Sequence, residues 1–143
     1  MCWDAVRGFV THPRAPAAAR SFAMVELEGA LAAGAERQEL LDDVALVVSE
    51  LLTNSLNAGA TLALVRLDWH RDLLRLAVVD DAPGLPTPQW PSADQTHGRG
   101  IGIINAVSRA WGADPLPNSE TGKQVWADFH VATSLTAALR CTR

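Results

Sequence analysis

The most informative segment of the chain is Glu50-Leu51-Leu52-Thr53-Asn54-Ser55-Leu56-Asn57. Apolar residues recur at helical spacing in this segment and just before it, so one stripe of a helix is predicted to face a core. The residues of that stripe are Leu40, Leu41, Val44, Val47, Val48, Leu51 and Ser55. Glu50, Asn54 and Asn57 follow at i, i+4 and i+7, and they therefore lie along a neighbouring stripe.

This polar stripe has two interpretations. Asn is a poor residue for a helix interior because its amide competes for backbone hydrogen bonds, so two of them beside a carboxylate indicate a use for oxygen ligands. A hard cation such as Mg²⁺ takes one or two such ligands together with phosphate oxygens. The alternative is a solvated polar face.

Two later segments bear on that choice. In residues 74–84 an apolar, strand-like run ends in Asp80 and Asp81 and continues into a turn with Pro and Gly. In residues 97–107 a glycine-rich turn runs straight into an apolar-periodic helix, where free N–H groups and the helix dipole favour phosphate. A tight turn is the alternative for these glycines, and their spacing fits neither the P-loop nor the dinucleotide fingerprint.

The order of the three segments carries a resemblance to a known family. A Glu-x-x-x-Asn helix comes first, a strand ending in Asp-x-x-x-Gly follows, and Gly-x-Gly-x-Gly opens a second helix. This order resembles the GHKL ATPases, the superfamily of gyrase, MutL and histidine-kinase catalytic domains. Residues 18–20, 48–54, 98–101 and 122–127 look most like the small bacterial anti-sigma-factor serine/threonine kinases and their actinobacterial relatives. The resemblance covers about residues 14–132, and the whole chain, 1–143, is predicted to be one ATP-binding domain.

Composition and charge are those of a single globular domain. The 143 residues are 48% hydrophobic and 20% charged, which is ordinary for one soluble domain with a real core. A net charge of −4 argues against a nucleic-acid surface. No apolar run is long enough to span a bilayer, and the start carries Asp4 without the apolar stretch of a signal peptide. Cys2 and Cys141 form neither a zinc cluster nor a disulfide framework, so free thiols in a reducing cytoplasm are expected.

Local signals predict a two-layer α+β fold. Helices are expected over residues 15–33, 37–58 and 100–109, and strands over residues 61–69, 73–80, 111–114 and 123–132, with an edge strand within 1–13. Residues 82–97 hold four prolines and are predicted to be a functional loop, and residues 118–122 a turn. Two or three helices over one face of a mostly antiparallel sheet make an α+β sandwich, which the resemblance specifies as the Bergerat (GHKL) type.

The resemblance implies a site for ATP and Mg²⁺. Asp80 matches the carboxylate that accepts a hydrogen bond from the adenine amino group, and Gly84 matches the second glycine of that motif, with Ala82 in place of the first. Asn54 matches the residue that holds Mg²⁺ through its carbonyl oxygen. The phosphates would be bound by Gly98, Arg99, Gly100, Ile101 and Gly102. For Arg99, a contact with a partner protein is the alternative.

Glu50, one turn before Asn54, is placed to take a proton from an attacking hydroxyl. In the resembled kinases that hydroxyl belongs to a small anti-anti-sigma (STAS) protein; with water in its place the protein would be an ATPase. A sigma factor is a possible second partner, and a homodimer is left open. Two departures count against fast phosphoryl transfer, because Ala58 replaces a usual His and Gln124 replaces a common Thr near the phosphates.

Two alternatives to a kinase remain. One is a binding module whose contacts depend on nucleotide but which transfers no phosphate. The other is an interaction domain that has lost nucleotide, and the intact set of site residues argues against it.

Overall fold

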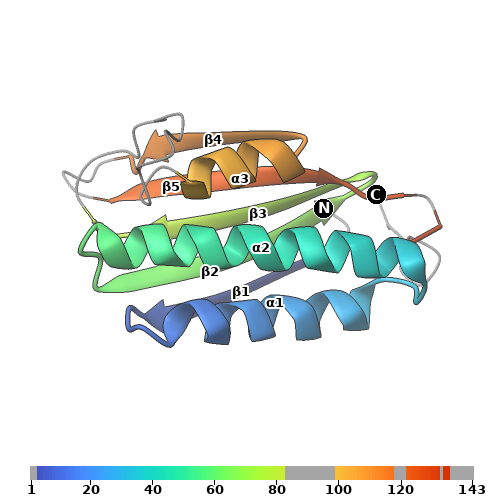
Figure 1. The fold of residues 1–143 in the computed structure, drawn as a ribbon, viewed down its shortest axis with the longest axis horizontal. Helices are drawn as coiled ribbons and strands as arrows, with labels where there is room; N and C mark the ends of the chain where they lie inside the picture. The colour runs from blue at the N-terminus through green and yellow to red at the C-terminus, as the bar shows by residue number, and fades with distance from the viewer. Residues whose placement is uncertain (1–2, 83–98, 118–121, 133, 136–143) are drawn as a thin grey trace.

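The computed structural model describes residues 3–82, 99–117, 122–132 and 134–135, and for residues 99–101 it describes the backbone alone. The described residues form five strands and three helices (Figure 1). In chain order they are β1 (Trp3–Val10), α1 (Ala15–Ala30), α2 (Ala35–Asn57), β2 (Leu62–His70), β3 (Leu73–Asp80), α3 (Arg99–Val107), β4 (Ala110–Pro115) and β5 (Lys123–His130).

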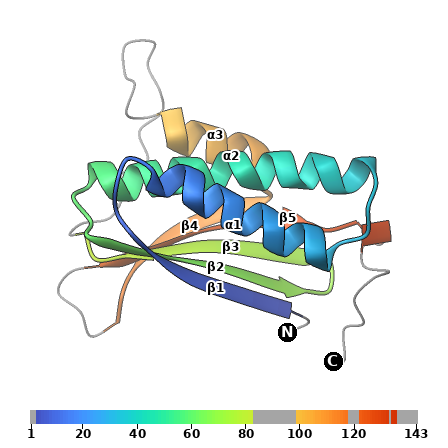
Figure 2. The ribbon, with the colours of Figure 1, turned by 90° about the horizontal axis from the view of Figure 1, so that it is seen from below.

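The five strands form one antiparallel sheet in the order β1-β2-β3-β5-β4. All three helices lie on one face of this sheet (Figures 1 and 2), with α1 against β1, α2 against β3 and β5, and α3 against β4. The predicted two-layer α+β sandwich is confirmed. The N-terminal edge strand is confirmed as well, because β1 pairs with β2 at the margin of the sheet.

The hydrophobic core lies between the helices and the sheet, and α2 supplies its centre. Its buried residues are Leu40, Leu41, Val44, Val47, Val48, Leu51, Leu52 and Ser55. They contain the whole predicted apolar stripe, so that prediction is confirmed. Strand β2 meets them with alternating buried side chains, because successive residues of a strand point to opposite faces. Each fully buried Leu or Val contributes about 1.5–3 kcal/mol, which holds the helical layer on this face.

The ends of the first two helices differ from the prediction for a packing reason. Helix α1 ends at Ala30 instead of residue 33, because Leu31 adopts an extended backbone (φ −109°, ψ 149°) and buries its side chain in the core. The guanidinium of Arg37 donates hydrogen bonds to the carbonyl oxygens of Glu28 and Leu31, at 3.3 and 3.4 Å, and so satisfies groups that the helix end leaves free. Helix α2 begins at Ala35, two residues earlier than predicted.

Several predictions concern residues outside the described part of the chain. The predicted loop at residues 82–97 lies there except for Ala82, and the predicted turn at residues 118–122 lies there except for Gly122. Cys2 and Cys141 also lie outside it. None of the described helices has the length and hydropathy that crossing a membrane requires.

Candidate functional site

The predicted site lies where β3 ends and β5 begins, under the C-terminal half of α2 (Figure 1). Asp80, the last residue of β3, stands opposite Lys123, the first residue of β5. A cavity of about 20 Å³ lies beside this pair. Its polar lining consists of Asn54, Ser55, Asp80 and Lys123. Its apolar lining consists of Leu51, Val78, Ile104, Trp111 and Val125.

The carboxylate of Asp80 is buried and accepts hydrogen bonds on both oxygens. Oδ2 accepts a hydrogen bond from Ser55 Oγ at 2.5 Å. Oδ1 accepts one from Lys123 Nζ at 2.9 Å and one from the backbone N–H of Ala82 at 3.1 Å. The Lys123–Asp80 contact is also an ion pair, whose side chains are 5% and 2% exposed. A buried carboxylate without such donors would cost several kcal/mol, so these three groups make the burial of Asp80 possible.

The neighbouring Asp81 has a different role. Its side chain is exposed and accepts hydrogen bonds from the hydroxyl of Thr61 and from the backbone N–H groups of Thr61 (2.7 Å) and Leu62 (3.2 Å). These hydrogen bonds, that of the Thr61 hydroxyl first, hold the pKa of Asp81 below its usual value. The pair of aspartates in the sequence therefore divides: Asp80 belongs to the site, and Asp81 fixes the start of β2.

The polar stripe of α2 lies beside the cavity. Asn54 lines the cavity, and its side chain is half-buried. Glu50, one turn earlier, is also half-buried, and its carboxylate has no hydrogen-bond or ion-pair partner among the described residues. Asn57, at the end of the stripe, is exposed. The structure thus brings Asn54 to Asp80, keeps Glu50 on the adjacent turn, and leaves Asn57 out of the cavity lining.

Only part of the predicted phosphate-binding set can be placed. Gly84 and Gly98 lie outside the described residues, and the side chain of Arg99 is not described. Helix α3 begins at Arg99, one residue before the predicted start, so Gly100 and Gly102 fall in its first turn.

Helix α3 is held beside the cavity by Ile104, which is fully buried and lines it. Ile101 lies one turn earlier on the same helix. Free N–H groups in the first turn of a helix can bind anions, and this turn directly precedes Ile104. The phosphate contacts stay a prediction.

The three residues that depart from the family's pattern lie in different surroundings. Ala82 is buried and contributes its backbone, because its carbonyl accepts a hydrogen bond from the N–H of Gly122 at 3.2 Å. Ala58 is exposed at the end of α2. Gln124 stands opposite Val79 and, by the alternation of the strand, points to the sheet face away from the site. The predicted proximity of the Gln124 side chain to the phosphates is therefore wrong.

Sequence reasoning missed two residues of the site. Ser55 was expected on the core stripe, but its hydrogen bond to Asp80 joins residues 25 positions apart and has no local signal. Lys123 did have a signal, because it precedes Val125, Ala127 and Phe129 at strand spacing, and all three are buried. That alternation places Lys123 on the helix-covered face with them.

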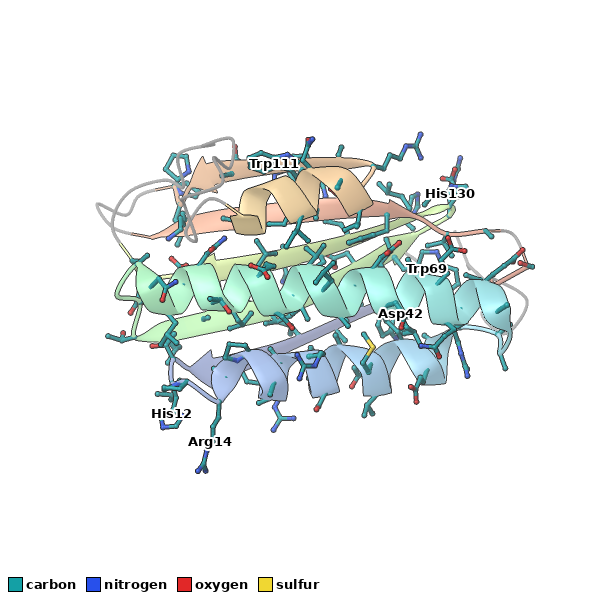
Figure 3. The ribbon with its side chains drawn as sticks, viewed as in Figure 1. His12, Arg14, Asp42, Trp69, Trp111 and His130 are labelled. Atoms are coloured by element: carbon teal, nitrogen blue, oxygen red, sulfur yellow. The ribbon has the colours of Figure 1, made fainter. Side chains whose placement is uncertain are left out.

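A larger hollow, of about 510 Å³, lies at the other end of α2. One of its lining residues is His130, which is labelled in Figure 3. Its wall on α2 carries Glu36, Glu39 and Asp43. Burial, and then the charges of Glu39 and Asp42, raise the pKa of Asp43. None of the predicted site residues lines this hollow, and its carboxylates would repel a triphosphate. The small cavity at Asp80 is therefore the better candidate.

The site thus combines a buried strand-end carboxylate with an oxygen-bearing helix face, in a two-layer α+β sandwich. The family model of the histidine kinase-like ATPase domain matches residues 12–129. The chain therefore belongs to the histidine kinase-like ATPase domain family. No curated protein matches the chain.

The residues present fit ATP and Mg²⁺ in type. Among the described residues, no group of three His, Cys, Asp or Glu side chains could hold a metal ion by itself. A magnesium ion bound by the amide oxygen of Asn54 would therefore take its other ligands from phosphates and water, which is the usual arrangement for this ion. Asp80 supplies a carboxylate of the kind that would accept a hydrogen bond from adenine, but a cavity of about 20 Å³ does not admit a purine ring.

Proposed function

We propose that the protein binds Mg-ATP and acts as a regulatory serine/threonine protein kinase of the anti-sigma-factor type. Its substrate would be a small anti-anti-sigma (STAS) protein in the cytoplasm, and its output the control of a sigma factor. One observation carries the proposal: Asn54 and Asp80 line the same cavity, and Glu50 lies one helical turn from Asn54.

Each of these residues would have its own role in binding. The Asp80 carboxylate would accept a hydrogen bond from the adenine amino group and so select adenine over guanine. The amide oxygen of Asn54 would bind the magnesium ion that neutralises the phosphates. The N–H groups in the first turn of α3 would contact the phosphates themselves.

Glu50 would serve as the general base. The hydroxyl oxygen of a Ser or Thr of the partner attacks the γ-phosphorus, and the bond from this phosphorus to the bridging oxygen of ADP breaks. The proton of the hydroxyl passes to the Glu50 carboxylate. The absence of any partner for this carboxylate among the described residues supports the role, since a base must be free to accept a proton.

One observation favours a second candidate function. All three donors to Asp80 come from the protein itself, and the cavity beside it is small. A protein that binds nucleotide only after a rearrangement could use ATP to change its shape for a partner without transferring phosphate. This nucleotide-dependent binding module is the alternative to the kinase.

The test is Glu50→Gln, measured with labelled ATP and a STAS-type partner under single-turnover conditions. The affinity for ATP should stay within a few-fold, while phosphoryl transfer should fall by roughly 10²–10⁴, the usual contribution of a general base. Glu39→Gln is the matched control, because Glu39 is an exposed carboxylate on the same helix, far from the site. It should change neither quantity.

Two outcomes would contradict the kinase. If Glu50→Gln transfers phosphate as fast as the wild type, Glu50 is not the base. If the wild type binds ATP but phosphorylates no STAS-type partner, the binding module is the better description.

A further inference from the structure

The chain contains one lysine, and it is buried in the candidate site. Of the 12 Lys and Arg residues, 11 are Arg, and the single Lys is Lys123. Its side chain is 5% exposed, and its ammonium lies 2.9 Å from Asp80 Oδ1. Lys side chains are almost never fully buried in folded proteins, because the charged ammonium group is strongly hydrated. Its use at this one buried position calls for an explanation in terms of the site.

The backbone around Lys123 directs it to Asp80. Gly122 adopts a φ of 104°, a conformation that favours glycine, immediately before β5 begins. The N–H of Gly122 donates to the carbonyl of Ala82, which joins the residue before Lys123 to the residue two positions after Asp80. The two side chains therefore lie at the same level of neighbouring strands and on the same face of the sheet.

The hydrogen bonds of Asp80 leave little capacity for another donor. A carboxylate accepts about four hydrogen bonds, two on each oxygen. Oδ1 already has two donors, Lys123 Nζ and the N–H of Ala82, and Oδ2 has one, Ser55 Oγ. An adenine amino group would need the last position or the position of an existing donor.

The space beside Asp80 is equally limited. The cavity of about 20 Å³ would hold roughly one water molecule. The Lys123 side chain forms part of its wall, together with Asn54, Ile104 and Trp111. Of the three donors, only Lys123 offers a long and flexible side chain that can move aside, since the other two are a short hydroxyl and a backbone group.

We propose that Lys123 competes with adenine for Asp80 and thereby sets the affinity of the protein for ATP. In the nucleotide-free protein the ammonium of Lys123 occupies the donor position at Asp80. Adenine binds when this ion pair breaks and the lysine side chain leaves the cavity. The inference rests on the proposed function, because it assumes that Asp80 is the adenine acceptor.

The first experiment removes the competitor. In Lys123→Met, a side chain of similar length has no charge, while Ser55 and Ala82 still donate to Asp80. The affinity for Mg-ATP, measured by calorimetry, should rise roughly 10-fold or more, since a hydrogen bond to a charged group no longer has to be broken. GDP binding, which does not use an adenine amino group, should not gain in the same way.

The matched control is Arg75→Met. Arg75 and Asp128 form a second ion pair between β3 and β5, with contacts of 2.7 and 2.9 Å. Arg75 stacks on the ring of Trp126, on the sheet face away from the site. The substitution removes an ion pair between the same two strands, so this variant tests for a general effect on the sheet. The affinity for ATP should not change.

The second experiment uses the wild type and does not depend on a variant that folds. Because Lys123 is the one lysine, protein labelled with ¹³C,¹⁵N-lysine gives a single lysine side-chain signal in NMR. Saturating Mg-ADP, with saturation established by calorimetry, should shift this signal and speed the exchange of its ammonium protons with water. GDP at the same concentration should leave it unchanged.

The outcomes separate this inference from the proposed function. ATP binding by the wild type with an unmoved lysine signal, or with no gain in Lys123→Met, overturns the competition and leaves the ATP site in place. Binding by Lys123→Met where the wild type binds weakly or not at all supports it. Failure of both proteins to bind any adenine nucleotide overturns the proposed function and this inference together.

Discussion

The buried ion pair at the site should dominate the effect of mutations on stability there. Asp80→Asn leaves the ammonium of Lys123, 5% exposed, without a carboxylate. Removing one partner of a buried pair costs about 3–5 kcal/mol, and the whole stability of a domain is about 5–15 kcal/mol. We expect Asp80→Asn to lower the free energy of unfolding by that amount, and Lys123→Met to do so less, because Ser55 and Ala82 still donate to Asp80.

The double variant Asp80→Asn/Lys123→Met should recover much of this loss. Its Asn oxygen can still accept from the N–H of Ala82, its amide NH2 can donate to the hydroxyl oxygen of Ser55, and no charge is left in the cavity. We expect it to lie within about 1–2 kcal/mol of the wild type, because replacing both partners of a buried pair is far milder than removing one. Urea denaturation at 25 °C, with equal m-values required, measures all four proteins without nucleotide.

The comparison pair is Arg75–Asp128, on the other face of the same strands. The Arg75 side chain is 41% exposed, so water screens this pair, and its coupling should be about 1 kcal/mol or less. If the Asp80→Asn and Lys123→Met losses simply add in the double variant, the two groups do not interact and the reasoning about a competing lysine loses its basis. The expected loss of stability in Asp80→Asn also means that this variant alone is an ambiguous test of ATP binding.

Three further predictions concern other residues. Asn54→Ala should weaken binding of Mg-ATP much more than binding of ATP in EDTA, because the lost ligand contacts the cation; calorimetry in both buffers measures this, and equal losses would make Asn54 merely structural. Asp43→Asn should raise the melting temperature at pH 7, since burial and neighbouring carboxylates disfavour its charge. A carboxyl group whose pKa is raised in the folded protein contributes stability below the ordinary value of 3.8, and this contribution is lost as the pH rises through the folded pKa. The increase in melting temperature caused by Asp43→Asn should therefore vanish in acid, and an increase that persists there would contradict this prediction. Gly112→Ala should cost about 1–3 kcal/mol, because the added Cβ would lie 2.6 Å from the Trp126 ring, whereas at Gly8, which has nothing within 4 Å, the same change should cost much less; equal denaturation midpoints would refute this.

Much of the fold was predictable because its signals are local. The apolar stripe of α2 repeats over several turns, and each of its predicted residues is buried. The end of α1 was missed by three residues because the prediction followed helix-forming composition up to Gly34, whereas packing pulls Leu31 into the core. At this helix end the burial of Leu31 outweighs the helix propensity of the residues that follow Ala30.

The site was predictable in part for a different reason. Asn54 and Asp80 belong to motifs, and the sheet brings those motifs together. The contact of Asp80 with Lys123 spans 43 positions, and a charged residue at the start of a strand is normally exposed. Gln124 was placed near the phosphates from the family resemblance, and in a strand neighbouring residues point to opposite faces, so a match that is one residue out reverses the face.

Because a one-residue shift reverses the sheet face of every side chain in a strand, the Lys123–Asp80 pair also affects how β3 and β5 align during folding. If β5 paired with β3 one residue out of register, Gln124, Trp126 and Asp128 would turn under the helices, and Lys123 would turn toward solvent. Both interstrand ion pairs, one on each face, would break at once. Strands β3 and β5 are 43 residues apart in sequence at the pairing of Asp80 with Lys123, so no short turn sets their alignment. The charges that shape the cavity therefore also select the one strand alignment in which the cavity exists.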